Sequence, residues 1–524
     1  MEAIGICIGN TSPIKVNLLS KIPLKLGQFV YIWYKEEGKD RKLLAMVQSV
    51  ERFNRYINDS INDISKTDLI MDNSDTKVVG TLQILGEIKE IGDSIHLEML
   101  KTPPPPSAKL LRPEKEVLER LFGAKDKRSV RIGRLLSEEE EIPVYIDISQ
   151  VVLRHLAILA VTGAGKSNTV SVLLEQIANL KGTVVVFDFH GEYTKADFRR
   201  DGKKVVNVIE PVFDPTKLPQ RDFANLIGIK QNATVQYRYF KRALQEILQF
   251  YKDDKGNDWR TLVKTGEFFK QLIYYLESWI EEPEKPPFKG KIREDSLYEV
   301  INKIEDTMSD IGHLIQVGAP DLITKIEEGK INVFNFSEID ENIADAIGSN
   351  ILKHALEDRK RAVRLGSGSL SSDIRLKSPI LFIIEEAHIL AGANKNTESK
   401  NYMTKIAREG RKFGVGLCIV TQRPKGLDKE ILSQMNNMII LKLVEPEDQK
   451  HVQSASESLS KELMDYLPAL NPGEAIIIGN MTKIPLLVKI DKAKGKIQGN
   501  DLDVVGSWDK NLEKISDIQE LSNL

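Results

Sequence analysis

Cysteine is scarce in this chain of 524 residues, which has only Cys7 and Cys418. Two cysteines cannot form a zinc cluster, and the seven histidines are too scattered along the sequence to suggest one. We therefore expect no structural metal. So little cysteine also fits a reducing compartment better than an oxidising one.

Long apolar runs and a basic charge excess are missing too. No stretch approaches the roughly 18 residues of a membrane-spanning helix, and the amino terminus lacks the order of a signal peptide. We expect a cytoplasmic protein with no membrane partner. Because the net charge is −2, a nucleic acid would have to bind a local basic patch or channel, not a basic surface as a whole.

The pattern of apolar residues predicts an α/β protein with several domains. Short strands separated by Gly, Asn, Asp and Pro precede residue 135, and near-continuous apolar strands alternating with helices follow from residue 156. The first pattern predicts a small β-barrel or sandwich, and the second a mainly parallel buried sheet. The expected division is a β-barrel (1–135), an α/β core in two parts (136–214 and 331–490), an inserted helical subdomain (215–330) and a C-terminal arm (491–524).

A phosphate-binding loop is the most informative motif. The run Gly163-Ala164-Gly165-Lys166-Ser167 follows the apolar strand expected at 156–161 and precedes a helix. The glycines let backbone N–H groups surround phosphates, Lys166 neutralises the β and γ oxygens, and the Ser167 hydroxyl is placed to bind Mg²⁺. Ala160 replaces the first glycine of the usual pattern, at a position that only closes the strand. The predicted nucleotide-binding residues here are Gly163, Ala164, Gly165, Lys166, Ser167 and Asn168.

Polar residues follow three further strands of the predicted sheet. Ligands of open α/β sheets bind at the carboxyl ends of the strands, where Asp188, Glu385-Glu386 and Gln422 are expected. We expect Glu385 and Ser167 to bind Mg²⁺, and Glu386 to orient or deprotonate the attacking water. Gln422 is expected to sense the γ-phosphate or that water. An acid after a strand can also simply cap the next helix, so this alternative stays open.

Two arginines lie between the strand that precedes Glu385-Glu386 and the strand that precedes Gln422. A guanidinium from a neighbouring subunit can stabilise the charge that develops on a γ-phosphate. Arg411 is the first candidate for this role and Arg408 the second. Two ordinary surface arginines at helical spacing would look the same.

Together these residues resemble the HerA family of hexameric DNA translocases, relatives of the FtsK and VirB4 motors. The resemblance covers nearly the whole chain. It rests on Arg154-His155, the P-loop, Asp188-x-His190-Gly191-Glu192-Tyr193, Glu385-Glu386-Ala387-His388, Ala407-Arg408-Glu409-Gly410-Arg411-Lys412-x-Gly414, Gln422-Arg423-Pro424 and Pro472-Gly473-Glu474-Ala475.

The resemblance implies a barrel, a RecA-like ATPase with a helical-bundle insert, and a ring of six subunits around double-stranded DNA. It also implies ATP and Mg²⁺ as cofactors and a NurA-type nuclease as partner in end resection and double-strand-break repair. Family position suggests that Arg154 contacts nucleotide, although a surface salt bridge is an equal alternative, and that Thr482 and Lys483 lie near the base. In a ring, Lys395 and Lys400 are expected to face DNA, unless their loop is only solvated.

Two other functions remain open from the sequence. A VirB4-like motor that moves protein through a secretion channel would share the same ATPase core, and so would an ATP-dependent scaffold that is not a motor. DNA-stimulated ATPase activity distinguishes the first function from these two.

Overall fold

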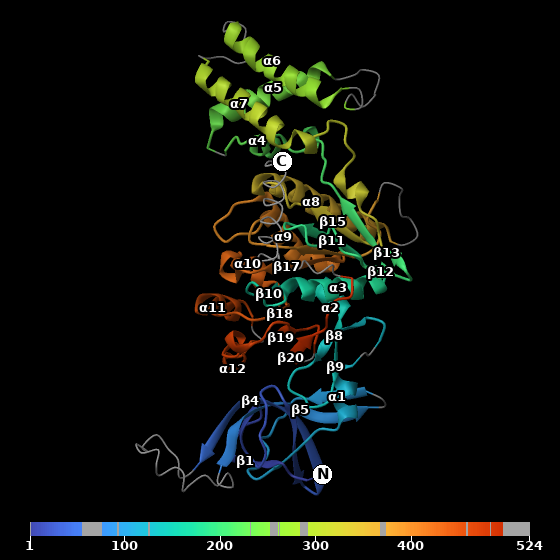
Figure 1. Ribbon diagram of the computed structural model, residues 1–524, viewed down its shortest axis with the longest axis vertical. Helices are drawn as coiled ribbons and strands as arrows, with labels where there is room; N and C mark the ends of the chain where they lie inside the picture. Colours follow the sequence, from blue (N-terminus) through green and yellow to red (C-terminus); the bar gives the residue numbers. More distant parts are fainter. Residues whose placement is uncertain are drawn as a thin grey trace, which may run out of the picture.

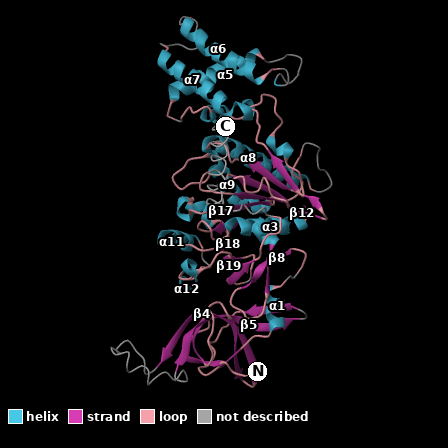
Figure 2. Ribbon diagram, in the orientation of Figure 1, coloured by secondary structure: helices cyan, strands magenta, loops and turns pink. Residues whose placement is uncertain are grey.

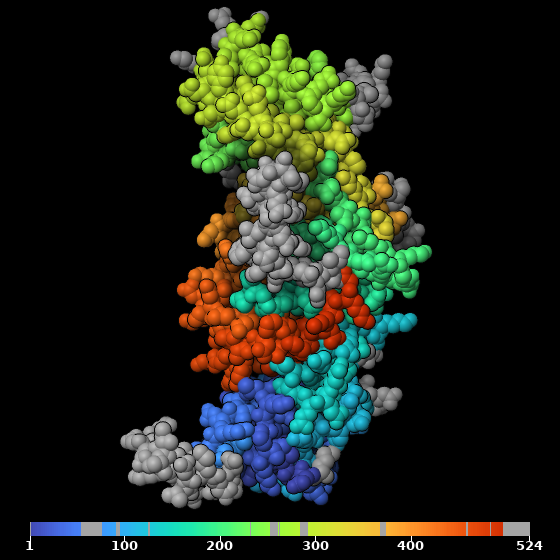
Figure 3. Space-filling view, in the orientation of Figure 1, coloured from blue at the N-terminus to red at the C-terminus, as the bar shows by residue number. Residues whose placement is uncertain are grey.

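In the computed structural model, the described residues are 2–54, 76–91, 94–123, 126–230, 232–251, 260, 263–282, 292–366, 374–456, 459–482 and 484–495. They form an elongated molecule with a β-barrel at one end, an α/β core in the middle and a helical bundle at the other end (Figure 1). The space-filling view shows these parts as one continuous column (Figure 3). Within the described residues, no helix is long and apolar enough to cross a membrane.

The N-terminal sheet closes into the expected barrel. Its strands are β1 (Gly5–Thr11), β2 (Lys15–Ser20), β3 (Phe29–Glu36), β4 (Lys39–Asn54), β5 (Thr76–Ile91), β6 (Ser94–Glu98) and β7 (Lys109–Leu111). The strand order is β2-β1-β7-β3-β4-β5-β6, and β2 also pairs with β5, which closes the barrel and leaves β6 outside it. Alternating side chains such as Val16 and Leu18 on β2 fill the interior.

The central sheet has eleven strands. They are β8 (Ser129–Leu135), β9 (Pro143–Asp147), β10 (Leu156–Leu159), β11 (Thr183–Asp188), β14 (Val206–Ile209), β15 (Ile331–Asn335), β16 (Ile380–Ile384), β17 (Val415–Thr421), β18 (Asn437–Ile440), β19 (Glu474–Gly479) and β20 (Leu486–Ile490). The order is β14-β15-β11-β16-β17-β10-β18-β19-β20-β8-β9. Pairing is parallel from β14 to β18 and antiparallel beyond β18, so the mainly parallel α/β core is confirmed.

One part of this sheet differs from the predicted division. Residues 129–135, which the sequence places in the barrel, form β8 and pair with β20 of the central sheet. The alternating pattern of β8 shows that one of its faces is buried, but it does not show against which sheet. The remaining small strands, β12 (Arg199–Arg200) and β13 (Lys203–Lys204), form a separate hairpin.

Helices lie on both faces of the central sheet, beside the barrel and in the bundle at one end of the molecule (Figure 2). They are α1 (Lys115–Phe122), α2 (Ile148–Arg154), α3 (Lys166–Asn179), α4 (Gln220–Leu226), α5 (Thr234–Phe250), α6 (Thr265–Glu281), α7 (Glu294–Ile311), α8 (Glu341–Leu365), α9 (Glu398–Glu409), α10 (Lys429–Ser433), α11 (Pro446–Ala455) and α12 (Lys461–Met464). Short 3-10 helices are η3 (Pro215–Lys217), η5 (Gly312–Leu314), η6 (Leu322–Lys325), η7 (Gly410–Lys412), η8 (Pro424–Gly426) and η9 (Leu467–Ala469).

The direction of each crossover decides which face a helix covers. The chain moves through α3 from β10 toward the β14 edge, but through α8 and α9 it moves the other way, from β15 to β16 and then to β17. Because parallel crossovers are right-handed, α3 lies on one face and α8 and α9 lie on the other. The inserted helices α5, α6 and α7 pack against one another at the end of the molecule, which confirms the helical bundle.

Candidate nucleotide-binding site

The P-loop connects β10 to α3 at the carboxyl edge of the parallel strands. Gly163 and Gly165 have φ values of 77° and 101°, which suit glycine. A Cβ at Gly165 would lie 3.1 Å from the backbone nitrogen of Gly473, a close contact that adds to the preference for glycine at this position. Ala160 is buried, and its N–H donates to the Thr421 carbonyl as in an ordinary strand. The loop therefore has a geometry that can surround phosphate groups.

Two buried glutamates lie beside the lysine of this loop. Glu385 and Glu386 follow β16 directly and are 3% and 4% exposed. The Lys166 ammonium lies 3.3 Å from Glu385 Oε2 and donates a hydrogen bond to Glu386 Oε1. The sequence predicted that these three residues would meet at one edge of the sheet, and the structure brings them into direct contact.

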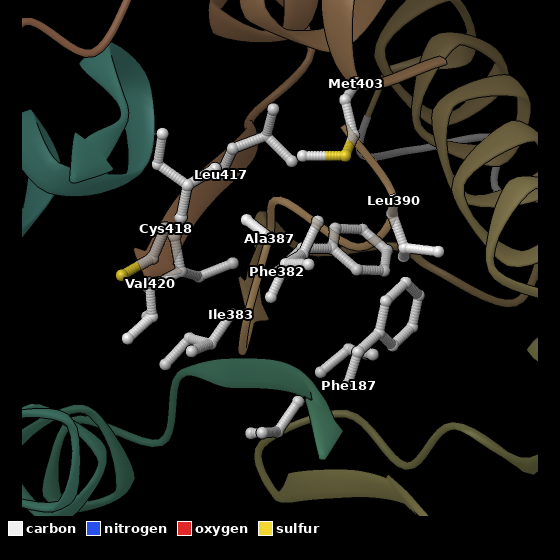
Figure 4. Packing of buried hydrophobic residues seen from close by; sticks show 14 of the residues in the cluster. Phe187, Phe382, Ile383, Ala387, Leu390, Met403, Leu417, Cys418 and Val420 are labelled. Atoms are coloured by element: carbon white, nitrogen blue, oxygen red, sulfur yellow. The ribbon is translucent and has the colours of Figure 1, made fainter. Parts of the chain in front are cut away.

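The apolar core fixes the turn that carries the acid pair. Ala387 and Leu390 follow Glu386 and are fully buried. Figure 4 shows Leu390 close to the rings of Phe187 on β11 and Phe382 on β16, whose centroids are 6.1 Å apart. Since a packed core deforms little, the two carboxylates have little freedom to move relative to the P-loop.

Burial and Lys166 act differently on the two carboxyl groups. Burial dominates at Glu385 and raises its pKa, although Lys166 acts in the other direction. Burial also acts to raise the pKa of Glu386, but the hydrogen bond and the charge of Lys166 outweigh it and lower that pKa. Glu386 is therefore the more firmly ionised carboxylate, as a base that orients water requires.

Glu386 lies at the centre of a polar cluster. The side-chain amide of Gln422 donates from Nε2 to Glu386 Oε1 at 3.1 Å, and its Oε1 accepts from the Thr162 hydroxyl of the P-loop. His388 Nδ1 lies 3.4 Å and His190 Nε2 3.7 Å from its two oxygens. Glu386 itself has a φ of 42°, a left-handed conformation that is uncommon for residues other than glycine. Such local strain occurs preferentially at functional sites.

Asp188 is engaged with its own backbone. Its carboxylate accepts hydrogen bonds from the N–H groups of His190, Glu192 and Tyr193, which is close to the capping role that the sequence left open. This turn places Tyr193, whose hydroxyl donates to Glu385 Oε1 at 2.6 Å. No role was predicted for Tyr193, although it lies in the motif on which the family resemblance rests. Tyr193 and Lys166 therefore contact the two oxygens of Glu385 and together orient its carboxyl group.

Asn168 also binds the chain's own backbone. Its amide donates to the carbonyl of Asp491 and accepts from the N–H of Ala493, which fastens the start of the C-terminal arm to α3. Glu175 on the same helix accepts from the N–H groups of Lys494 and Gly495. A direct contact between Asn168 and nucleotide remains a prediction. Beyond residue 495 the arm lies outside the described residues.

Other predicted site residues lie at the opposite edge of the sheet. Arg154 lies before β10, Arg411 lies in η7 before β17, and Thr482 follows β19, which runs antiparallel. Because a strand rises about 3.3 Å per residue, β10 alone separates this amino edge from the P-loop by roughly 13 Å. Arg154 and Thr482 line a cavity of about 790 Å³ there. Lys483 lies outside the described residues.

The two arginines of the predicted catalytic set differ in their contacts. Arg408 forms an ion pair with Glu430. Arg411 is exposed and has no salt bridge to another residue in the described part of the chain. A third arginine, Arg423, lies at the carboxyl edge and acts to lower the pKa of His388, after the larger effect of burial. No role was predicted for Arg423, although it directly follows Gln422.

The two predicted DNA-contacting lysines have partners within the chain. Lys400 lies 2.7 Å from Asp428 and also donates to the carbonyls of Gly392 and Lys395. Lys395 pairs with Glu341 at 2.5 Å and is the more exposed of the two. Lys395 is therefore better placed to reach a phosphate than Lys400, and contact with DNA stays a prediction for both.

The oxygen donors at the P-loop suit Mg²⁺. This ion prefers hard oxygen ligands and usually takes one or two from the protein, with the rest from phosphate and water. Ser167 is the second residue of α3, directly after Lys166, and Glu385 approaches the same lysine from the turn after β16. Ser167 and Glu385 therefore stay the predicted ligands of Mg²⁺. No group of three or more His, Cys, Asp or Glu side chains that could hold a metal ion occurs in the described residues.

Replacement of Glu386 by Gln should separate binding from hydrolysis. The amide keeps the shape of the side chain and its contact with Gln422 but loses the basic carboxylate, so turnover should fall by about 10²- to 10³-fold. ATP should still bind, which equilibrium binding of a fluorescent ATP analogue measures. Glu385→Gln is the matched control. If Glu385→Gln stops turnover with nucleotide bound and Glu386→Gln does not, the two assigned roles are reversed.

Comparison with known families agrees with this geometry. The sequence model for the central domain of helicase HerA matches residues 130–355, and the helicase HerA-like C-terminal model matches residues 373–489. A probable helicase of Methanocaldococcus jannaschii is 39% identical over 99% of this chain and 97% of its own length. A protein of Sulfurisphaera tokodaii named DNA double-strand break repair helicase HerA is 36% identical over 99% of both chains.

Solved structures show a more distant likeness. VirB4 of Thermoanaerobacter pseudethanolicus aligns with a TM-score of 0.47 and 15% identity over 72% of this chain and all of that chain. The plasmid coupling protein TrwB in complex with ADP and Mg²⁺ aligns with a TM-score of 0.45 and 13% identity, over 72% of this chain and 98% of that one. The full-length curated relatives and the two matching domains decide the assignment. The chain is an ATP-hydrolysing enzyme and belongs to the HerA helicase family.

Proposed function

We propose that the protein is an ATP-driven translocase or helicase for double-stranded DNA. It works as a hexameric ring with a NurA-type nuclease in end resection and double-strand-break repair. Relatives named DNA double-strand break repair helicase HerA support the repair role. The resemblance of the sequence to this family supports the ring and the nuclease.

The observation that carries the proposal is the separation of the site into two edges of one sheet. Lys166, Glu386 and Gln422 lie at the carboxyl edge, whereas Arg411 and Arg154 lie at the amino edge. We infer that the two edges act on the same nucleotide when they come from different chains. In a closed ring with one repeated interface, the amino edge of each subunit can face the P-loop of its neighbour.

The residues of the two neighbouring chains then have distinct tasks at that interface. Lys166 and the P-loop backbone hold the phosphates, and Glu386, held by Gln422, orients the attacking water. Ser167 and Glu385 would hold Mg²⁺, which supplies positive charge to the phosphates when bound. Arg411 of the neighbour stabilises the developing charge. Arg154 and Thr482 of the neighbour contact the rest of the nucleotide through the cavity at the amino edge.

Duplex DNA should stimulate the ATPase activity of the purified protein. A translocase couples each hydrolysis event to movement along the phosphate backbone, so its turnover should rise with linear duplex of any sequence. The stimulation should weaken as salt increases from about 50 to 200 mM, because phosphate contacts release counterions. Steady-state ATPase assays with two duplexes of unrelated sequence measure both effects.

Lys166→Ala, assayed for DNA binding by anisotropy, is the control for this experiment. It should bind DNA without hydrolysis. Turnover of the wild-type protein that is indifferent to DNA would contradict a DNA motor. That result would favour a secretion motor or a scaffold.

A further inference from the structure

A pair of buried polar residues lies at the centre of the amino edge. His155 is 2% exposed and Asn437 is fully buried. They belong to segments far apart in sequence, at the end of α2 and the start of β18. We call His155 and Asn437 the amino-edge pair.

His155 connects its own segment to the one that carries the catalytic arginine candidates. Its Nδ1 accepts the N–H of Leu417 at 3.1 Å, and its Nε2 lies 3.1 Å from the carbonyl of Ala407. Burial lowers the pKa of His155 to about 4, so the ring is neutral near pH 7. Since Nδ1 accepts, the proton is on Nε2, which donates to Ala407. Ala407 directly precedes Arg408, and η7 with Arg411 lies between the two contacts.

Asn437 connects His155 to the remaining part of the edge. Its amide donates to the carbonyls of Gln150 and His155 at 3.0 and 2.8 Å, on both sides of Arg154. Its oxygen accepts the N–H of Met481 at 2.7 Å, directly before Thr482. Both N–H groups of the Asn437 amide and one of the two acceptor sites of its oxygen therefore form hydrogen bonds with the backbone.

The backbone at His155 is strained. Its φ and ψ are 62° and 162°, in a region that residues other than glycine rarely adopt. Such a conformation persists only where the surroundings enforce it. The surroundings here are the contacts of the imidazole and of Asn437, and the strained peptide directly follows Arg154.

We propose that His155 and Asn437 are positioning residues that hold Arg154, the Arg408–Arg411 segment and Thr482 as one rigid face toward the nucleotide of the neighbouring subunit. This inference rests on the proposed ring, in which the amino edge acts in trans. Neither residue touches the nucleotide of its own chain, because both lie on the edge away from the P-loop. Their loss should therefore damage the site of the neighbour and leave their own P-loop intact.

Mixed rings test this inference. His155→Gly relieves the strained backbone but removes both imidazole contacts, and Asn437→Ala removes the three amide contacts. Each should lower ATPase activity about 10- to 100-fold, as expected for misplaced catalytic groups. Each variant is then mixed with Glu386→Gln, whose amino edge is intact, and separately with Arg411→Ala, whose amino edge is defective. Activity should recover with Glu386→Gln and stay low with Arg411→Ala.

Asn332→Ala controls for a merely structural effect. Asn332 is another fully buried asparagine of the sheet, and it holds the backbone of Val184 and Glu327, away from the arginines. This variant should lose thermal stability as Asn437→Ala does but keep its ATPase activity per folded ring. Thermal unfolding and the assembled mass of each variant are measured before the assays.

Three results would overturn the inference. They are full activity of both pair variants, recovery with Arg411→Ala instead of Glu386→Gln, or recovery with neither partner. The mixture of Arg411→Ala with Glu386→Gln reports separately on the proposed function. If that mixture stays inactive while His155→Gly recovers with Glu386→Gln, the role of Arg411 fails, and the pair still positions a face that acts in trans.

Discussion

Lys166→Ala should reduce ATP hydrolysis by about 10³-fold or more, because it removes the positive charge that holds the transferred phosphoryl group. The structure adds a second consequence. The Lys166 ammonium is buried and is shared by Glu385 and Glu386. Loss of one partner of a buried ion pair typically costs about 3–5 kcal/mol, so this variant should also unfold at a lower temperature.

A double variant separates the catalytic effect from the structural one. Lys166→Ala combined with Glu386→Gln removes one of the two uncompensated carboxylates, so it should regain part of the lost stability without any activity. Steady-state ATPase assays and thermal unfolding on the same samples give both quantities. Turnover at the wild-type rate in Lys166→Ala would remove the P-loop assignment.

The phosphate-binding half of the site could be predicted because it is local in sequence. Gly163 and Gly165 provide positive φ values next to Lys166, within one turn between a buried strand and a helix. The acid pair could be predicted because it follows five apolar residues, which form the buried strand β16. Parallel strands bring their carboxyl ends to one edge, so these segments had to meet.

The other contacts depend on topology that no local pattern encodes. Tyr193 reaches Glu385 across 192 residues of sequence, and a single tyrosine has no periodicity to mark it. Thr482 was expected near the base of the nucleotide, whose phosphates the P-loop would hold at the carboxyl edge. However, β19 runs antiparallel to β18 and delivers its end to the amino edge. His155 and Asn437 also meet through topology, because β10 and β18 are far apart in sequence but neighbours in the folded sheet.

The same separation of edges makes a strong prediction for Arg411. If its guanidinium acts on the nucleotide of the neighbouring subunit, Arg411→Ala should lower the ATPase rate by about 10³-fold or more while its own P-loop and Glu386 remain complete. Glu386→Gln has the opposite defect, because its Arg411 is intact. Neither protein alone has a working interface.

A mixture of these two inactive proteins should therefore regain activity when subunits exchange before the rings form. At equal amounts, about one interface in four pairs an intact Glu386 with an intact Arg411, and independent sites would then add to roughly a quarter of the wild-type rate. Translocation needs several working sites in sequence and should recover less. Exchange is verified by native mass spectrometry of differently tagged subunits.

Arg423→Ala is the matched arginine control, because Arg423 lies at the carboxyl edge with the P-loop of its own chain. Any loss of activity that it causes falls on the same site as Glu386→Gln, so the mixture of these two should stay inactive. Arg411 acting within its own chain would give that pattern as well, with no recovery at any mixing ratio although exchange is complete. Suppose that ATPase activity recovers when Glu386→Gln is mixed with Arg411→Ala but not when it is mixed with Arg423→Ala. This result would support the amino edge as the part of the site that each subunit supplies to its neighbour.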